Sequence, residues 1–233
     1  MHVPKHFAEQ DEQRMRALIR ERGFGTLVTS GPEGPVANHL PFHLDDAGHL
    51  QCHVARANPV WQQLQRSSRV LVIFHGPDAY ISPNWYATKQ ETGKAVPTWN
   101  YQVIHAHGNA VVVQDRDWLR QHLDRLTHDN EGGRPQAWQV DDAPADYIER
   151  MTNALVGLEI TVDRLEGATK ASQNQPERNR EGVREGLRRE GRETATAISR
   201  EVPCREQTSR HGNAECVPIY RTDWKPSNWG GPR

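Results

Sequence analysis

A chain of 233 residues is long enough to bury a hydrophobic core without the help of disulfides or metals. Its 29 Lys and Arg residues are balanced by 30 Asp and Glu residues, and a formal net charge of −1 excludes a chain-wide attraction to nucleic acid or anionic membranes. The sequence has no signal-peptide pattern and no apolar run near the roughly 20 residues that span a bilayer, so we expect a cytoplasmic protein. Three scattered cysteines do not resemble the disulfide framework of a small secreted domain.

The N-terminal part of the chain has the pattern of a helix followed by short strands. Asp11 is a good N-cap and Gly23 a good stop for a helix over residues 11–22. Short strands at close spacing favour an antiparallel barrel or sandwich over βαβ units. β-rich segments between Gly and Pro turns predict strands over residues 26–30, 36–44, 49–54, 70–74 and 79–82, and a long strand over 98–113.

Helical patterns dominate the C-terminal part. Apolar residues at helical spacing predict helices over residues 116–128 and 146–155, followed by a last strand over 157–165. Alternating Arg and Glu predict a short solvated helix that ends near residue 189, and the polar, aperiodic sequence from residue 193 onward indicates disorder. We therefore expect one folded domain over residues 1–189 and a disordered tail over 190–233.

The first candidate site is a junction between a strand and a helix over residues 53–61. Asn58 suits an N-cap and Pro59 the first helical position, so free backbone N–H groups would face an approaching ligand. Arg56 adds a planar set of donors that suits phosphate. The alternative is an ordinary capped helix with an arginine on its surface.

The second candidate site is a run of aromatic residues interleaved with Ser, Thr, Asn and Lys and interrupted by prolines. Trp85, Tyr86, Trp99 and Tyr101 lie close together in the sequence, and prolines of this kind do not suit core strands. Such a run offers the apolar faces and the few polar groups that a flat heteroaromatic ring requires. The alternative is that the two tryptophans cover the mouth of a barrel that holds no ligand.

A histidine pair lies within the long predicted strand. His105 and His107 share one face of that strand because side chains alternate along it. The neighbouring sequence offers no carboxylate or cysteine at ligand spacing, so we interpret the two residues as a hydrogen-bonded structural pair and predict no metal site.

Several segments resemble the PaiB family, described as FMN-binding negative transcriptional regulators. The resemblance spans roughly residues 1–189 and implies a mainly β fold with flanking helices, an FMN-binding split β-barrel related to pyridoxamine-phosphate oxidases and flavin reductases. It also implies a homodimer with FMN near the subunit interface. The matching segments are residues 3–7, 36–42, 53–59, 81–86, 97–101, 105–108 and 172–174.

The resemblance also implies which residues hold the cofactor. Arg56 and Asn58 would lie near the phosphate, and the four aromatic residues would lie near the ring. The chain departs from the family around Lys170, where a second cation and an aromatic residue are absent. The candidate cofactor-binding residues are His53, Ala55, Arg56, Asn58, Ser82, Trp85, Tyr86, Lys89, Thr98, Trp99, Asn100, Tyr101 and Lys170.

These observations favour a homodimeric FMN-binding regulator of transcription, with only weak support for direct DNA binding because the net charge is near zero. The alternative is a flavin-dependent oxidoreductase that uses the same pocket, in which His39, His53 or His107 would move protons. A haem-binding split barrel ranks last, since only the number of histidines suggests it.

Overall fold

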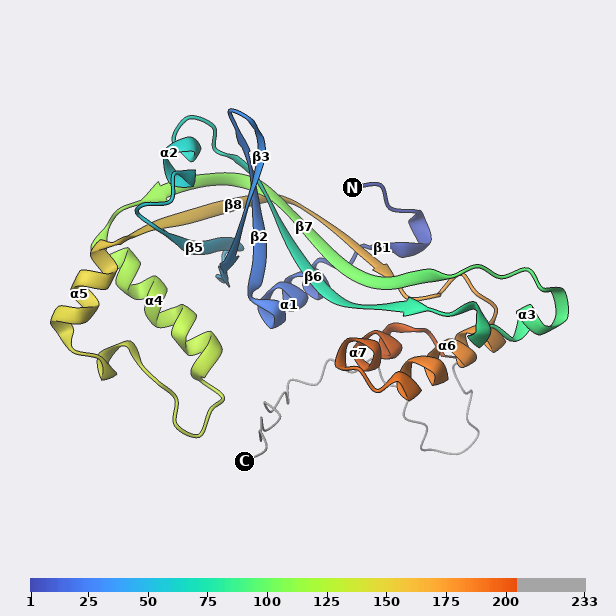
Figure 1. Ribbon diagram of the computed structural model, residues 1–233. Coiled ribbons are helices and arrows are strands. Elements are labelled where there is room, and N and C mark those ends of the chain that lie inside the picture. The colour runs from blue at the N-terminus through green and yellow to red at the C-terminus, as the bar shows by residue number, and fades with distance from the viewer. Residues whose placement is uncertain (205–233) are drawn as a thin grey trace. The chain divides into compact units, whose positions relative to one another are not determined.

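Long antiparallel strands connected by short helices make up the computed structural model, which describes residues 1–204 (Figure 1). The chain divides into two compact units, and β6, β7 and β8 contribute residues to both. Within the described residues, unit 1 comprises Met1–Leu18, Phe74–His105 and 165–204, and unit 2 comprises Ile19–Ile73 and Ala106–Arg164.

The strands form one mainly antiparallel sheet with the order β3-β2-β6-β7-β8-β5-β4, and β1 pairs with β8. This topology confirms the predicted class, mainly β with flanking helices. The strands are β1 (Ala8–Glu9), β2 (Phe24–Gly31), β3 (Gly34–Pro41), β4 (His43–Leu44), β5 (His49–Ala55), β6 (Arg69–Ile81), β7 (Thr98–Val113) and β8 (Leu155–Lys170). The helices are η1 (Lys5–Phe7), α1 (Glu12–Arg22), α2 (Val60–Leu64), η2 (Pro83–Trp85), α3 (Ala87–Thr92), α4 (Arg116–Glu131), η3 (Val140–Asp142), α5 (Ala145–Asn153), α6 (Glu177–Glu190) and α7 (Glu193–Glu201).

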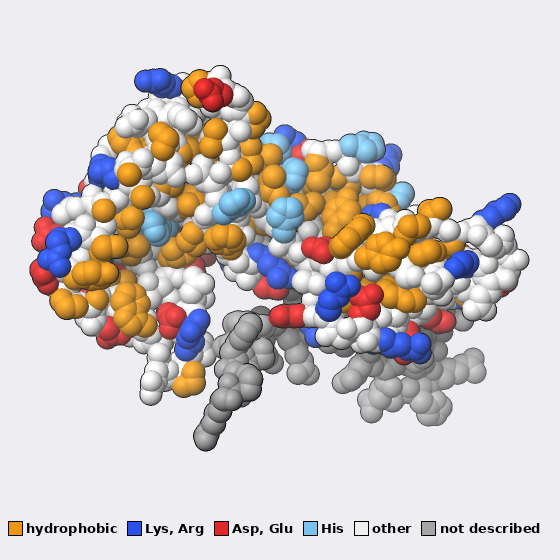
Figure 2. All heavy atoms as spheres, viewed as in Figure 1, with side chains coloured by type: hydrophobic (Ala, Val, Ile, Leu, Met, Phe, Trp, Pro, Cys, Tyr) orange, Lys and Arg blue, Asp and Glu red, His pale blue; other side chains and the backbone are white. Residues whose placement is uncertain are grey.

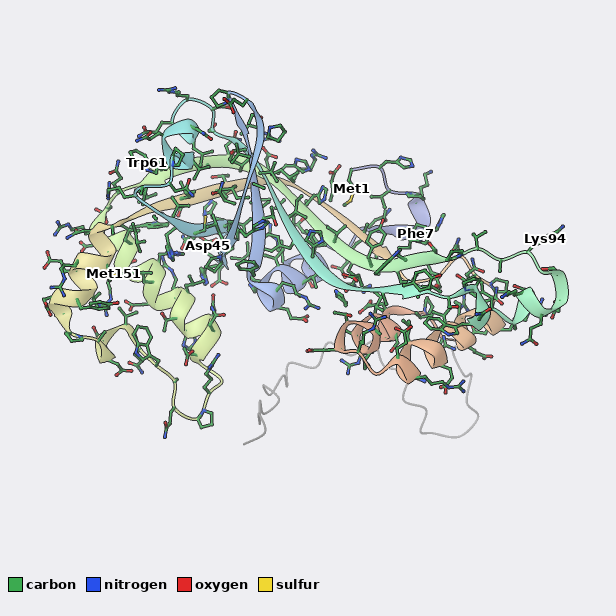
Figure 3. The ribbon with its side chains drawn as sticks, viewed as in Figure 1. Met1, Phe7, Asp45, Trp61, Lys94 and Met151 are labelled. Atoms are coloured by element: carbon green, nitrogen blue, oxygen red, sulfur yellow. The ribbon has the colours of Figure 1, made fainter. Side chains whose placement is uncertain are left out.

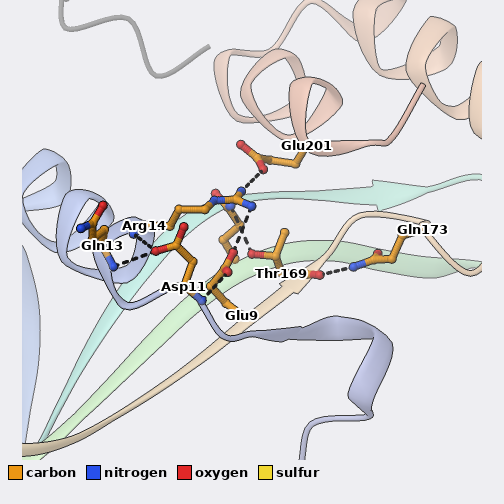
Figure 4. Close-up of polar contacts among 8 residues, drawn as sticks. Glu9, Asp11, Gln13, Arg14, Thr169, Gln173 and Glu201 are labelled. Carbon is orange, nitrogen blue, oxygen red and sulfur yellow. Dashed lines mark hydrogen bonds and ion pairs between the residues drawn. The ribbon is translucent and has the colours of Figure 1, made fainter. Parts of the chain in front are cut away.

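The start of α1 follows the predicted capping chemistry. The Asp11 carboxylate accepts hydrogen bonds from the backbone N–H groups of Gln13 at 2.9 Å and Arg14 at 3.2 Å. The Arg14 guanidinium in turn pairs with Glu9 at 3.4 Å and Glu201 at 3.1 Å (Figure 4). These contacts connect β1, α1 and α7 within unit 1.

One predicted turn is absent, because Gly76 and Pro77 lie inside the continuous strand β6 and do not separate two strands. Gly76 permits a close contact, since a Cβ atom there would lie 2.6 Å from the Cβ of Gln102. The glycine therefore allows close packing within an extended strand. The local sequence does not show whether a glycine has this role or forms a turn.

The predicted disorder is wrong for residues 193–201, which form α7. Ala195, Ile198 and Val202 lie along one side of this segment and are buried. They join a core cluster of unit 1, so the folded part of the chain extends beyond the expected boundary at residue 189. The remainder of the predicted tail, residues 205–233, lies outside the described residues. The other members of the cluster are Ala79, Ile81, Tyr86, Ala171, Val183 and Leu187.

The helices in the described part of the chain are short. The longest, α4, has 16 residues. Within residues 1–204, no helix combines the length and the apolar character that a membrane crossing requires.

Two glycines of α6 allow Trp85 to pack directly against that helix in unit 1. A Cβ atom on Gly182 would lie 1.9 Å from the backbone oxygen of Trp85, and one on Gly186 would lie 2.3 Å from its indole ring. Both distances are far below a van der Waals contact, so neither position can carry a side chain unless the helix moves.

We predict that Gly182→Ala lowers the free energy of unfolding by about 2 kcal/mol, because the clash with the Trp85 backbone outweighs the helix propensity that alanine adds. Chemical denaturation of the full chain measures the effect. Glu181→Ala, at an exposed position of the same helix, is the matched control and should leave stability nearly unchanged. Equal stability of Gly182→Ala and the unmodified chain would contradict this packing.

Candidate functional site

The start of β7 presents different side chains to its two faces. Trp99 and Tyr101 are 53% and 37% exposed, whereas Asn100 and Gln102 between and after them are buried. This alternation is the two-residue period of a strand that has solvent on one face and packed side chains on the other. The two predicted ring contacts Trp99 and Tyr101 therefore share a solvent-facing surface.

Tyr80 of β6 extends this surface within unit 1. Its ring is 39% exposed and meets the Trp99 indole edge to face, with the ring centroids 6.1 Å apart at an interplanar angle of 74°. We call Tyr80, Trp99 and Tyr101 the aromatic face. Figure 2 shows hydrophobic side chains at several places on the surface of the described residues. A flat ring could stack on such a surface.

Lys170 contacts the other side of the β7 start. Its ammonium group donates a hydrogen bond to the Thr98 hydroxyl and lies 5.8 Å from the centre of the Phe7 ring, which Figure 3 labels in the N-terminal segment. Partial burial lowers the pKa of Lys170. Within residues 1–204, no carboxylate forms a salt bridge with this amine. A half-buried cation without a counter-ion is suited to bind an anionic group.

The chain after Lys170 is held by a buried pair of hydrogen bonds. The Asn100 amide donates to the Ser172 hydroxyl at 3.0 Å, and the hydroxyl lies 3.2 Å from the Asn100 carbonyl oxygen. Ser172 has a φ of 60°, which is unfavourable for a residue with a side chain. The Gln173 side-chain amide donates to the backbone oxygen of Thr169 at 2.6 Å (Figure 4). Its side-chain oxygen accepts from the backbone N–H of Ala171 at 2.7 Å. These bonds hold the segment in its strained conformation.

The other two predicted ring contacts pack inside unit 1. Tyr86 is buried in the core cluster, and this burial raises the pKa of its phenol. Trp85 packs against the α6 glycines. The four aromatic residues therefore do not form one continuous exposed wall.

Ser82 and Lys89 take part in local hydrogen bonds of unit 1. The Ser82 hydroxyl accepts from the backbone N–H of Asn84 at 3.2 Å and caps η2. The Lys89 ammonium donates to the side-chain oxygen of Asn84. Both predicted site residues thus help to order the connection between β6 and α3.

The guanidinium of Arg56 in unit 2 forms hydrogen bonds with other residues of the same chain. It donates to the backbone oxygen of Asn153 at 3.0 Å, to the side-chain oxygen of Gln114 at 2.8 Å and to the backbone oxygen of Leu155 at 2.9 Å. Each of its three nitrogens therefore has an acceptor. The Trp61 indole, labelled in Figure 3, donates to the Arg56 backbone oxygen at 2.9 Å. The hydrogen bonds of this arginine therefore connect the end of β5 to the start of β8.

The helix after β5 begins one residue later than expected. Pro59 occupies the N-cap position of α2, and the helix starts at Val60. Asn58 accepts from the Val60 N–H at 3.0 Å and donates to the side chain of Asn38 at 2.8 Å. Ala55 ends β5, and its backbone oxygen accepts from the Asn58 N–H at 2.8 Å. A helix of five residues carries too small a dipole to support an anion site by itself.

His53 has a partner that is distant in the sequence. Its Nδ1 lies 3.0 Å from Nε2 of His122, a fully buried residue of α4 in the same unit. Burial lowers the pKa of His53. The available signal was the helical spacing that places His122 one turn after Trp118, an apolar residue of the predicted helix.

His105 lies near a carboxylate that is distant in the sequence. A ring nitrogen of His105 and a carboxylate oxygen of Glu166, both in unit 1, lie within 4.8 Å of each other. Glu166 also accepts a hydrogen bond from the N-terminal ammonium of Met1 at 2.7 Å. A carboxylate therefore lies near His105 in the structure, although none lies near it in the sequence.

Comparison with known proteins identifies relatives along most of the chain. The family model described as "Putative FMN-binding domain" matches residues 1–164. A protein of Bacillus subtilis (strain 168) named protease synthase and sporulation protein PAI 2 is 34% identical over 193 residues, which cover 82% of this chain and 90% of that protein.

Solved structures share the architecture at low sequence identity. A conserved hypothetical protein from Mycobacterium tuberculosis matches with a TM-score of 0.56 at 16% identity, covering 75% of this chain and 94% of its own. An FAD and heme binding protein from Mycobacterium smegmatis matches with a TM-score of 0.54 at 16% identity, covering 70% and 73% of the two chains. These likenesses bear on the fold alone, and they confirm the predicted split β-barrel class.

We predict that Asn100→Ala lowers the free energy of unfolding by about 1–3 kcal/mol, because the buried Ser172 hydroxyl loses both hydrogen bonds while its strained backbone remains. Urea denaturation provides the measurement. Asn174→Ala, at an exposed position of the same segment, is the control and should change stability by less than about 0.5 kcal/mol. An Asn100→Ala protein as stable as this control would show that the Asn100–Ser172 pair contributes little.

Proposed function

We propose that this chain, which belongs to the PaiB family of FMN-binding domains, binds FMN as a cytoplasmic homodimer and acts as a negative regulator of transcription. The flavin ring would lie on the aromatic face, with the second subunit near it. The aromatic face is the observation that carries this proposal, because it combines exposed rings with a rigid strand backbone.

Stacking chemistry supports the ring placement. Tryptophan and tyrosine rings bind a flat heteroaromatic group through apolar contact and leave its polar edge to hydrogen-bond donors. A ligand covered on one side by Trp99 and Tyr101 still exposes its other side to solvent. A second copy of the chain would cover that side, which is why we join FMN binding to dimerisation in one proposal.

Lys170 is the better supported of two cations for the phosphate. Thr98, which accepts the hydrogen bond from Lys170, and Trp99 are consecutive residues at the start of β7. The amine and the indole therefore lie at the same end of the strand but on its two faces, and one FMN molecule would reach both by passing around this end. Arg56 already uses three of its five N–H donors for hydrogen bonds within the chain, so fewer of its donors remain for an anion. Lys170 needs only to exchange a neutral hydroxyl partner for a charged one.

The regulatory role rests on the family resemblance and on the Bacillus subtilis relative, whose name refers to a protease synthase and to sporulation. A flavin-dependent oxidoreductase would use the same surface. Addition of NADH or NADPH to the flavin-loaded protein distinguishes the two functions: bleaching of the flavin spectrum identifies an enzyme and overturns the regulator assignment. An unchanged spectrum, together with salt-sensitive retention of promoter DNA, supports the regulator.

We predict that Trp99→Ala weakens FMN binding about tenfold or more, since a stacked aromatic contact contributes on the order of 1–3 kcal/mol. Titration of the stripped protein, followed by quenching of flavin fluorescence, measures the dissociation constant. Trp138→Ala removes a similarly exposed indole from unit 2 and should leave binding unchanged. Equal affinities of the two variants would remove the aromatic face from the site, and failure of the unmodified protein to bind FMN would overturn the proposed function.

We predict that Lys170→Met weakens FMN binding roughly tenfold but leaves riboflavin binding nearly unchanged, because riboflavin has the same ring and no phosphate. Arg56→Met serves as the comparison. A selective loss of FMN in Arg56→Met, with no change in Lys170→Met, would transfer the phosphate contact to the arginine.

A further inference from the structure

A layer of polar side chains lies between α4 and the sheet in unit 2, where a helix normally buries an apolar stripe. Helix α4 contacts β4 and lies above β5 and β8. We call this set the polar layer. Its members are His43, Gln51, His53 and Glu159 from the strands, and Trp118, His122, Arg125 and Asp129 from α4.

His122 is the most buried member, with no exposed surface. Its ring is stacked on Trp118 with the centroids 5.2 Å apart and the planes 17° from parallel. Its Nε2 lies 3.0 Å from Nδ1 of His53. Its other nitrogen, Nδ1, is buried and has no hydrogen-bond partner among the described residues. A second proton on this ring would therefore have no acceptor.

The His53–His122 contact holds one proton in the neutral state. One ring donates and the other accepts, because two N–H groups cannot face each other at 3.0 Å. A first added proton must occupy an outer nitrogen and place a positive charge inside the layer. A second added proton makes both rings donors and breaks the hydrogen bond between them.

The groups around this pair also disfavour added positive charge. The Arg125 guanidinium, on the same helix as His122, donates to Gln51 at 3.1 Å, and its Nε is buried without a partner among the described residues. Burial, followed by His53, Arg125 and His43, lowers the pKa of His122 to about 3.

The carboxylates of the polar layer interact with groups other than His122. Glu159 of β8 accepts from the Gln51 amide at 3.0 Å and from the Trp118 indole at 3.3 Å. Asp129, at the end of α4, lies 2.5 Å from Nδ1 of His43 on β4. Within residues 1–204, neither carboxylate has a hydrogen bond to His122, so the layer offers this ring no direct counter-ion.

We propose that the polar layer is an acid-sensitive latch: proton uptake by His53 and His122 detaches α4 from β5 within unit 2. The closed latch contains two neutral imidazoles, and the open latch exposes both to water, where they titrate near the ordinary value of 6.5. Opening therefore binds protons, and acidification favours the open state. Every contact that forms the latch lies within unit 2.

The direction and range of the effect follow from this linkage. Above pH 6.5 neither state gains a proton, so the opening equilibrium does not depend on pH. Between 6.5 and the lowered pKa of His122, each unit of acidification favours opening by up to about tenfold for each histidine that remains neutral in the closed state. Opening should therefore increase on the order of tenfold or more between pH 7.5 and pH 5.0.

Hydrogen–deuterium exchange with mass spectrometry on the full chain tests this proposal. Exchange of α4 peptides at pH 7.5 and 5.0, corrected for the intrinsic pH dependence of exchange, should show about a tenfold or greater loss of protection at the lower pH. Peptides of α6 in unit 1 serve as the internal reference and should not change. Protection of α4 that is the same at both pH values would overturn the proposal.

Two substitutions of His122 test whether the acid response of α4 comes from this histidine or from a general loss of stability at low pH. His122→Gln keeps a side chain that can bond to His53 and binds no proton, so the acid response of α4 should fall at least about threefold. His122→Phe preserves the ring stacked on Trp118 and provides the same test if the glutamine variant does not fold. His128→Gln, at an exposed position of α4, is the control and should retain the full response. An unchanged response in a folded His122 variant would also overturn the proposal.

Discussion

The two-residue period of β7 controls how the candidate site is built. Consecutive residues at its start point to opposite faces, so Asn100 secures the strained backbone at Ser172 while Trp99 and Tyr101 remain exposed. The surface proposed to receive a ligand is therefore the outer face of a strand whose inner face is held by buried hydrogen bonds. Rigid support of this kind keeps binding groups in place before a ligand arrives.

Close packing by glycine explains why similar aromatic residues have different roles. Trp85 fits against α6 because Gly182 and Gly186 leave room for it, and Tyr86 enters the neighbouring core. Among residues 1–204, no helix covers Trp99 and Tyr101 in this way. The segments that resemble the family thus contain residues that build unit 1 beside residues that are free to meet a ligand, and a shared motif does not separate the two roles.

Unit 2 uses charged and polar groups to join its elements. Arg56 fastens β5 to β8, while Glu159 and Arg125 take part in the polar layer under α4. Polar contacts are directional and depend on protonation, unlike apolar packing. Their use beneath a helix makes this interface more sensitive to pH than an apolar one would be.

The sequence by itself determined much of the strand and helix pattern, the length of β7, the cap of α1 and the resemblance that identified the family. Those features depend on residues that are neighbours in the chain, on periodicity and on turn chemistry. Only the tertiary structure decided which acceptors surround Arg56, that Lys170 meets Thr98 and that His122 meets His53. Lys170 and Thr98 are 72 residues apart and His122 and His53 are 69 apart, so strand pairing and helix packing must bring them together. The helix α7 was missed for the same reason, because its few apolar residues acquire a core only when unit 1 folds around them.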